Sequence, residues 1–450
     1  MNTASIAYRG APVLGALALV LLSFPTRAEA HEDNLSYIFL DVTENSMGGR
    51  LEVPIPDLRT VVGLDLDGSD AEIEAEANAE LTTISDYFDD HFAFEANGKD
   101  LDVTYTEAKM FFSEADEVDD NYMVLPFTVD VETPIPRNFD LTADLFAANI
   151  DGRQSWLILS NDWQTGVIDN GYDRLTVFSE GDKTQPVDLG DPNQFQNFTS
   201  SIKLGVQHIQ TGPDHILFVL VLLLPSVLVF TKSWEPTKSF GSALWRILKI
   251  ATMFTVAHSI TFTLAGLEII PLPSPRIVES IIALSIAAAA VHNIRPVVAN
   301  REWLISFVFG LFHGLGFASL ISGLDIEKST QLVSLLGRNV GIEIGQSIVI
   351  LLLFPALFLL RRTTYYQKFF VGFSIVLALL SIGWMIERSA EVDLGMNKIV
   401  DPIFAWPRVL LLVGVLSVIA AAVWYREKKS DALIPLDVDD SSSAPKTVSI

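Results

Sequence analysis

The sequence predicts a mostly β ectodomain of β-sandwich type with one helix, followed by an α-helical polytopic membrane domain of about seven transmembrane helices. One basis is charge: residues 31–199 contain 37 acidic and 8 basic side chains, a net charge of −29, whereas residues 200–450 have a net charge of +3. The other is hydropathy, because short alternating apolar runs fill the acidic part and long apolar runs fill the rest. A soluble acidic domain therefore precedes a membrane domain.

Residues 1–30 are typical of a signal peptide, with Arg9 ahead of an apolar run and Ala28-Glu29-Ala30 as the cleavage site. Cleavage there would make His31 the mature N-terminus. Its α-amine and imidazole could then chelate a metal ion together, so His31 is a hypothetical metal ligand of the ectodomain. The alternative is that His31 merely follows the cleavage site. The chain has no cysteine, which excludes disulfides and thiolate metal sites.

The acidic extracytoplasmic domain, residues 31–190, contains short runs that alternate between apolar and polar residues, as half-buried β-strands do. Asn97-Gly98 separates two such runs and predicts a tight hairpin. A helix is predicted over 70–91, because Ser69 and Glu72 can form a capping box ahead of an Ala- and Glu-rich run. These features predict a sandwich of immunoglobulin-like style with one inserted helix.

A short linker, residues 191–200, leads to the membrane domain, residues 201–425. Its seven apolar spans are each long enough for ~30 Å of hydrocarbon, and they lie near 213–231, 246–267, 276–295, 303–322, 338–360, 368–387 and 407–425. Lysine and arginine gather in the loops after the first, third, fifth and seventh spans. The positive-inside rule then predicts a bacterial inner-membrane protein with its N-terminal domain outside and a disordered cytoplasmic tail, residues 426–450.

The run G-V-Q-H-I-Q-T-G-P-D-H, residues 205–215, places two histidines and an aspartate at the start of the first span. Ionisable side chains cost ~2.5–3.5 kcal/mol each at membrane depth, so they mark a functional site. Gly212-Pro213 predicts a helix that begins at Pro213, with Asp214 and His215 in its first turn and His208 delivered to the same point. Imidazole and carboxylate groups are metal ligands. The alternative is a helix end with polar caps.

Later spans carry further ionisable and amide side chains, among which His258, His313 and Glu343 complete the predicted metal-binding set. A wider polar path would add Glu279, His292, Asn293, Asn339 and Gln346. Stripes of glycine, at Gly337, Gly341 and Gly345 and at Gly310 and Gly314, predict close helix packing. For any single histidine the alternative is an interhelical hydrogen bond. Burial of so many ionisable groups favours mutual pairing or a bound cation.

Five motifs occur in order: G-V-Q-H-I-Q-T-G-P-D-H, F-T-V-A-H-S-I-T-F, V-E-S-I-I-A-L-S-I, F-G-L-F-H-G-L-G-F-A and N-V-G-I-E-I-G-Q-S. Over roughly residues 200–360 the chain resembles the HupE/UreJ family, and more closely the longer branch with an exported N-terminal domain. A histidine, a glycine and an Asp-His pair at the spacing of His208, Gly212, Asp214 and His215 are shared with nickel/cobalt permeases. The resemblance implies a polytopic membrane protein linked to nickel uptake. Two residues depart from the pattern: Ile209 stands where the short permeases usually have a proline, and His292 stands where many relatives are expected to have a carboxylate.

We interpret the protein as a permease for a divalent transition metal, nickel or cobalt with zinc as an alternative, that acts in the lipid bilayer and is not an enzyme. The lack of cysteine and of a methionine cluster argues against Cu⁺ as the cargo. The chain has no phosphate-binding glycine loop, which argues against a nucleotide cofactor. The acidic domain would repel phosphate, which argues against nucleic acid as a partner. Two alternatives remain open. One is a seven-span metal-dependent intramembrane hydrolase with Ser259 as an accessory residue, and the other is a metal-sensing or assembly membrane protein.

Overall fold

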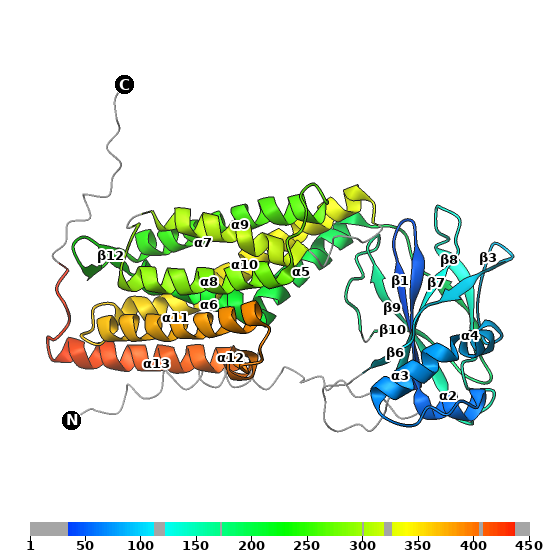
Figure 1. Ribbon diagram of the computed structural model, residues 1–450. Helices are drawn as coiled ribbons and strands as arrows, with labels where there is room; N and C mark the ends of the chain where they lie inside the picture. The colour runs from blue at the N-terminus through cyan, green and yellow to red at the C-terminus, as the bar shows by residue number, and fades with distance from the viewer. Residues whose placement is uncertain are drawn as a thin grey trace, which may run out of the picture. The chain divides into compact units, whose positions relative to one another are not determined.

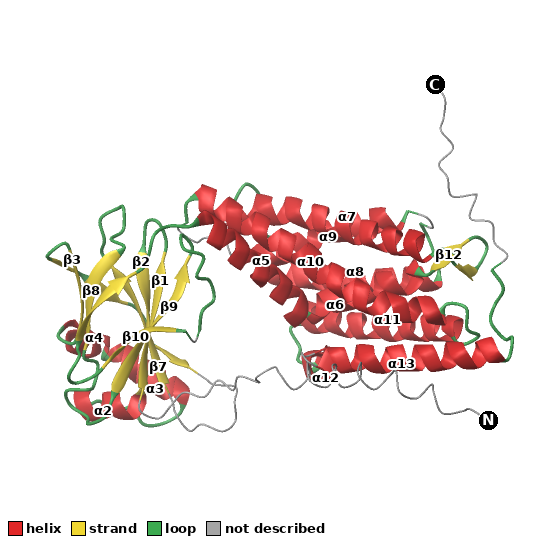
Figure 2. Ribbon diagram, turned by 180° about the vertical axis from the view of Figure 1, so that it is seen from behind, coloured by secondary structure: helices red, strands yellow, loops and turns green. Residues whose placement is uncertain are grey.

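The computed structural model describes residues 35–111, 122–171, 173–298, 301–318, 326–404 and 408–436. These residues form two compact units: one runs to Ser200 and includes a short segment that ends at Ser334, and the other holds the remaining residues from Ser201 onwards. The first unit is rich in β-strands and the second is a bundle of helices (Figures 1 and 2). The predicted signal peptide, His31 and residues 437–450 of the predicted tail lie outside the described residues.

Two sheets make up the β-rich unit. The larger has seven strands in the order β10-β9-β1-β2-β7-β5, with β6 also paired to β7, and the smaller has the order β11-β8-β3-β4. Only β1 and β9 run parallel, so the larger sheet is mixed. The strands are β1 (Leu35–Val42), β2 (Met47–Pro54), β3 (Phe92–Ala96), β4 (Lys99–Leu101), β5 (Val103–Tyr105), β6 (Lys109–Phe111), β7 (Tyr122–Val129), β8 (Asn138–Ala143), β9 (Gln154–Asp162), β10 (Arg174–Phe178) and β11 (Thr184–Asp188).

The core of this unit lies between the two sheets. The ring centroids of Phe92 in β3 and Phe127 in β7 are 5.1 Å apart, so the smaller sheet packs on the larger one. Every second residue of β3 is buried, which is the alternation that the sequence shows. The predicted hairpin is confirmed: Asn97 and Gly98, with φ angles of 54° and 73°, join β3 to β4 in the left-handed conformation that a tight hairpin turn requires.

Three helices accompany the sheets where the sequence predicts one: α2 (Ile55–Val62), α3 (Asp70–Ala79) and α4 (Leu81–Asp89). The capping box is confirmed, because the Ser69 N–H donates to the Glu72 carboxylate at 2.8 Å, and this bond helps to hold the pKa of Glu72 below its usual value. The predicted helix over 70–91 is interrupted at Glu80. The break follows Asn78, whose side-chain amide pairs with the backbone of Ala108, a contact distant in sequence.

Several buried acidic side chains of this unit have basic partners, and Asp57 is one of them. Arg153 donates to Asp57 at 2.7 Å, and the carboxyl is almost fully buried. Burial raises the pKa of Asp57, while the Arg153 guanidinium opposes that rise by favouring the charged form. The guanidinium therefore offsets only part of the cost of enclosing the carboxylate in the domain.

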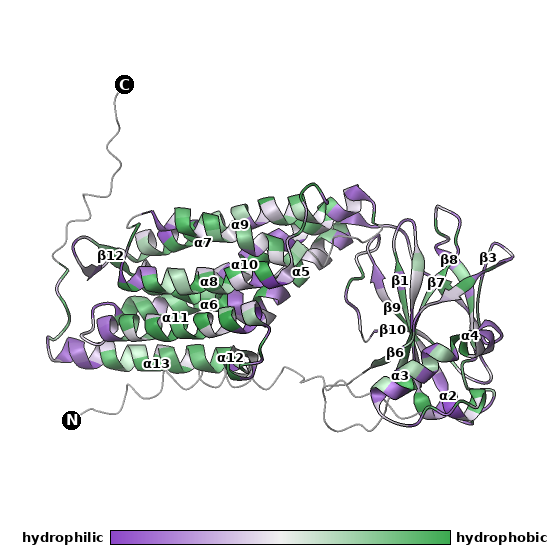
Figure 3. Cartoon of the chain, viewed as in Figure 1, coloured by the Kyte–Doolittle hydropathy of each residue, from purple (hydrophilic) through white to green (hydrophobic). Residues whose placement is uncertain are grey.

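The helical part of the chain contains nine helices within the described ranges and a short β-hairpin. The helices are α5 (Gln194–Thr211), α6 (Pro213–Ser226), α7 (Phe240–Gly266), α8 (Pro275–Ile294), α9 (Glu302–Ala318), α10 (Lys328–Leu360), α11 (Tyr366–Ala390), α12 (Met396–Phe404) and α13 (Arg408–Lys429), and the hairpin is β12 (Leu228–Phe230) with β13 (Trp234–Pro236). Figure 3 shows that apolar residues dominate the long helices.

Five of these helices, α7, α8, α10, α11 and α13, are long and apolar enough to cross a membrane. The bent pair of α5 and α6 would make a sixth span, and α9 is a shorter apolar helix of 17 residues. A membrane protein is therefore supported, but the predicted number of seven spans is not confirmed.

Two predicted boundaries differ from the structure. The stretch 191–200, predicted as a linker, is helical from Gln194, because Asn193 caps α5 by accepting from the Gln196 N–H at 3.0 Å. The predicted disordered tail begins too early, since α13 continues to Lys429.

Candidate metal centre

A sharp corner at Gly212 separates α5 from α6, whose axes differ by 74°. The helix α6 begins at Pro213, as the sequence predicts. A Cβ atom on Gly212 would lie 2.8 Å from the carbonyl oxygen of His208 and 3.1 Å from Oδ1 of Asp214, so a side chain at this corner would collide with its surroundings. The corner places the ring centroids of His208 and His215 4.4 Å apart.

His313 reaches the same place from α9, because glycines allow α9 and α7 to cross with their backbones in contact. At both Gly310 and Gly314, a Cβ would lie within 2.5 Å of a carbonyl oxygen of α7. In the same way, Gly205 and Gly341 let α5 cross α10. The predicted glycine stripes therefore lie at two helix crossings: one joins α9 to α7, each of which carries a histidine, and the other joins α10 to α5, which carries His208.

Asp214, His215 and His313 form a cluster in which one ligand atom from each residue lies within 4.8 Å of the others. His215 and His313 are 5% and 1% exposed, while Asp214 is partly exposed. Phe218 packs against His313 with ring centroids 5.2 Å apart, and Phe317 against His208 at 3.8 Å. The cluster thus combines one carboxylate with imidazoles in an aromatic, poorly hydrated environment, where charge interactions are strong.

Hydrogen bonds assign the free nitrogen of each ring in the cluster. Nδ1 of His215 lies 3.0 Å from Oδ1 of Asp214, so this nitrogen carries the proton and the lone pair is on Nε2. The Ser285 hydroxyl donates to the carbonyl of Ile282 at 2.6 Å, so it can only accept from Nε2 of His313, 3.0 Å away. The lone pair of His313 is therefore on Nδ1. Both of these free nitrogens are buried without a partner among the described residues.

His258 repeats this arrangement on α7. The Asn339 amide group donates to the carbonyl of Leu335 at 2.8 Å, so its oxygen accepts from Nδ1 of His258 at 3.2 Å. The lone pair of His258 is left on Nε2, which is buried and has no partner within the described ranges. His258 lies outside the group of three. An imidazole anchored through one nitrogen and free at the other is what metal-binding histidines show.

Glu343, predicted as a further ligand, does not belong to the group of three. Its Oε1 lies 2.6 Å from the hydroxyl of Thr252, on a partly exposed face between α10 and α7. Gln346 accepts from the Thr255 hydroxyl at 3.3 Å at the same helix pair. Helical spacing correctly placed these residues on α10 but could not show which neighbour each one faces.

A cavity of about 320 Å³ opens beside the cluster. His208, Asp214, His215 and His313 line this cavity, and so do Glu279, Trp384 and Arg388. Glu279, predicted as part of a polar path, therefore borders the same cavity as the cluster.

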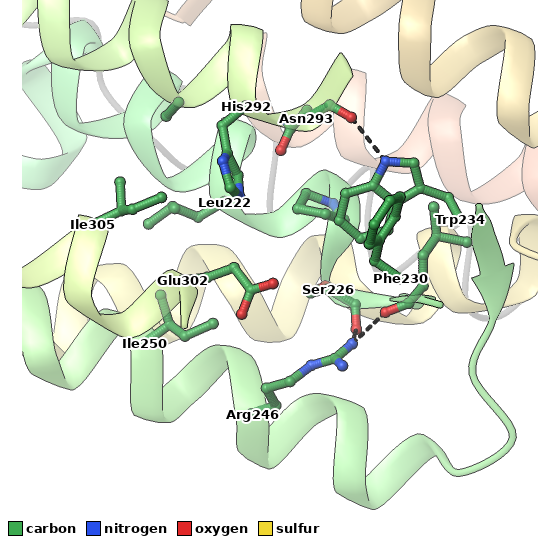
Figure 4. Close-up of a pocket in the computed structure, with 13 residues that line it drawn as sticks. Leu222, Ser226, Phe230, Trp234, Arg246, Ile250, His292, Asn293, Glu302 and Ile305 are labelled. Carbon is green, nitrogen blue, oxygen red and sulfur yellow. Dashed lines mark hydrogen bonds between the residues drawn. The ribbon is translucent and has the colours of Figure 1, made fainter. Parts of the chain in front are cut away.

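His292 and Asn293 belong to a different cavity, of about 30 Å³, which Figure 4 shows with Trp234, Arg246 and Glu302. Glu279 and His292 are 13 residues apart on α8, so the two cavities are separated by about 20 Å along that helix. Nδ1 of His292 accepts from the Val297 N–H at 3.2 Å, which leaves a proton, not a lone pair, on Nε2. The hairpin packs here, with Trp234 donating to the carbonyl of Asn293 at 2.9 Å.

Sequence reasoning missed three residues of the site: Ser285, Trp384 and Arg388. Ser285 lies in the motif V-E-S-I-I-A-L-S-I, but six residues after Glu279 it points about 120° away from that side chain around the helix, so helical spacing did not single it out. Arg388 follows the sixth predicted span and carries no local signal. Only the packing of α11 on α8 brings it to the cavity.

Residues 184–388 match a family model described as HupE / UreJ protein. These residues belong to the HupE/UreJ family. The matched range includes α5 to α9, all the described helices that supply the cluster, together with α10 and most of α11. The β-rich unit lies almost entirely outside the HupE/UreJ match. No curated protein and no solved structure matches this chain.

Proposed function

We propose that this HupE/UreJ protein is a permease for a divalent transition-metal cation, nickel or cobalt, and that Asp214, His215 and His313 bind the ion, with His208 and His258 as further ligands. The observation that carries the proposal is the anchoring of the imidazoles. Each of His215, His258 and His313 uses one nitrogen for a protein partner and keeps a buried lone pair free. Imidazole and carboxylate groups suit Ni²⁺, Co²⁺ and Zn²⁺.

The two cavities on α8 support a transport path. The larger one gives access to the cluster, whereas the smaller one is lined by Arg246, which donates to the carbonyls of Ser226 and Leu228 at 2.6 and 2.5 Å. We infer that the larger cavity faces outward and that the smaller one lies at the cytoplasmic end, because the basic loops gather there. The membrane potential would then favour entry of a dication by ~4.6 kcal/mol per 100 mV.

Uptake of radioactive Ni²⁺ into liposomes that contain the purified protein tests the proposal. We expect uptake that Asp214→Ala and His215→Ala abolish, while both variants remain inserted and folded. Wild-type uptake by both variants would contradict the proposed site.

The alternative of a metal-dependent hydrolase is less well supported. Ser259, its predicted accessory residue, donates to the carbonyl of Thr255 in its own helix at 2.6 Å. An open cavity beside three metal ligands is nevertheless also a feature of catalytic zinc sites.

A further inference from the structure

An arginine lines the cavity that leads to the proposed cation site. Arg388 in the last turns of α11 and Glu279 in the first turns of α8 both border it, and Arg388 Nε lies 3.3 Å from Glu279 Oε2. A fixed positive charge opposes the approach of a cation, so Arg388 needs a role other than direct binding.

This ion pair is suited to exchange. The side chains of Arg388 and Glu279 are 45% and 44% exposed, so solvent screens the attraction between them. Such pairs are weak and are readily replaced by a better partner. Arg276, at the same end of α8, instead donates to the carbonyl of Ser389 at 2.9 Å and lies 3.4 Å from Glu391, so it has its own partners.

The charges around the cavity also fit an exchange. Among the described residues that line it, Asp214 and Glu279 are the carboxylates and Arg388 is the guanidinium. With neutral imidazoles, the wall has a net charge of −1 while Arg388 is in place and −2 once it moves away. Only the second state matches a dication.

We propose that Glu279 and Arg388 form a charge gate over the metal site: Arg388 neutralises Glu279 while the site is empty, and an entering dication takes its place. This proposal rests on the proposed function. The gate favours divalent over monovalent ions, because a single charge competes poorly with the tethered guanidinium. The gate also couples metal binding to a movement between two helices. Glu279 is on α8, together with Ser285, which anchors His313, whereas Arg388 and Trp384 are on α11. Breaking the ion pair therefore removes one link between α11 and α8.

The test uses the full-length protein in liposomes and compares Arg388→Gln, Arg388→Lys and Glu279→Gln. Arg276→Gln is the matched control, because it removes an arginine from the same end of α8 without touching the cavity wall. Initial rates of Ni²⁺ uptake against concentration give KM, and efflux of radioactive Na⁺ measures leakage. We expect Arg388→Gln to lower KM several-fold and to raise Na⁺ efflux, and Glu279→Gln to raise KM several-fold. Arg388→Lys and the control should stay close to the wild type.

An unchanged or raised KM in Arg388→Gln, without Na⁺ leakage, would overturn the gate. If the ion pair only held the structure together, Arg388→Gln and Glu279→Gln would both show a higher KM and a lower thermal midpoint. If the wild-type protein transports no metal, the proposed function fails, and calorimetry of Ni²⁺ binding to the same proteins then tests the gate separately. Binding tightened several-fold in Arg388→Gln would support it, and equal affinities would refute it.

Discussion

A neutral imidazole has one proton and one lone pair, and in this bundle the partner of each ring decides which nitrogen holds which. The partner is Asp214 for His215, Ser285 for His313 and Asn339 for His258. The sequence could show the histidines and the aspartate, because all of them interrupt apolar spans. It could not show Ser285 as an anchor, since that role depends on the hydroxyl proton being committed to the carbonyl of Ile282.

Ser285→Ala tests this anchoring. The change removes the acceptor for Nε2 of His313, so the ring can turn and the proton can move to Nδ1, the nitrogen proposed to bind metal. We expect Ni²⁺ affinity to fall about 10- to 100-fold, the usual effect of losing such a partner. Calorimetry of the purified protein measures it.

Ser280→Ala is the matched control on the same helix, because its exposed hydroxyl donates only to the carbonyl of Arg276. Equal affinities for the two variants would mean that Ser285 does not position His313.

At the scale of elements, glycine decides how closely helices approach. Local signals predicted several elements well: the Asn97-Gly98 hairpin, the capping box of α3 and the start of α6 at Pro213 all depend on neighbouring residues. The interruption at Glu80 follows a contact with Ala108, thirty residues along the chain, so no local pattern could reveal it. The position of Glu343 beside Thr252 likewise depends on how α10 meets α7.

Gly314→Ala tests the crossing of α9 and α7. The added Cβ would lie 2.4 Å from the carbonyl oxygen of His258, so the helices must separate and carry His313 away from His215. We expect a loss of ~1–3 kcal/mol of stability, as for other overpacked sites, together with weaker Ni²⁺ binding. Thermal unfolding in detergent and calorimetry provide the two measurements.

In α11, a Cβ on Gly372 would meet no atom within 4 Å. Gly372→Ala should therefore be neutral or stabilise the helix by ~0.5–1 kcal/mol. A similar effect of the two substitutions would show that close packing at Gly314 is not needed.

For the whole molecule, composition predicted the order of parts: an acidic β-rich unit and then a helical one. That order follows from average charge and hydropathy, which need no knowledge of contacts. The number of spans could not be settled in this way, because α6 is only 14 residues long and meets α5 at a corner of 74°, and hydropathy does not show whether such a bent pair is one span.

That corner also has a physical consequence. The half-helix α6 contains 14 residues and is therefore only about 21 Å long, shorter than the ~30 Å of hydrocarbon in a typical bilayer. Since α5 turns away from its axis, α6 by itself cannot cross the hydrocarbon, and nine of its side chains are buried among neighbouring helices rather than facing lipid. A segment that stops short at membrane depth is tolerated where it is buried in protein or borders a water-filled cavity. The cavity beside Pro213 meets that condition, so an ion that enters there would have to leave water over roughly 21 Å instead of ~30 Å.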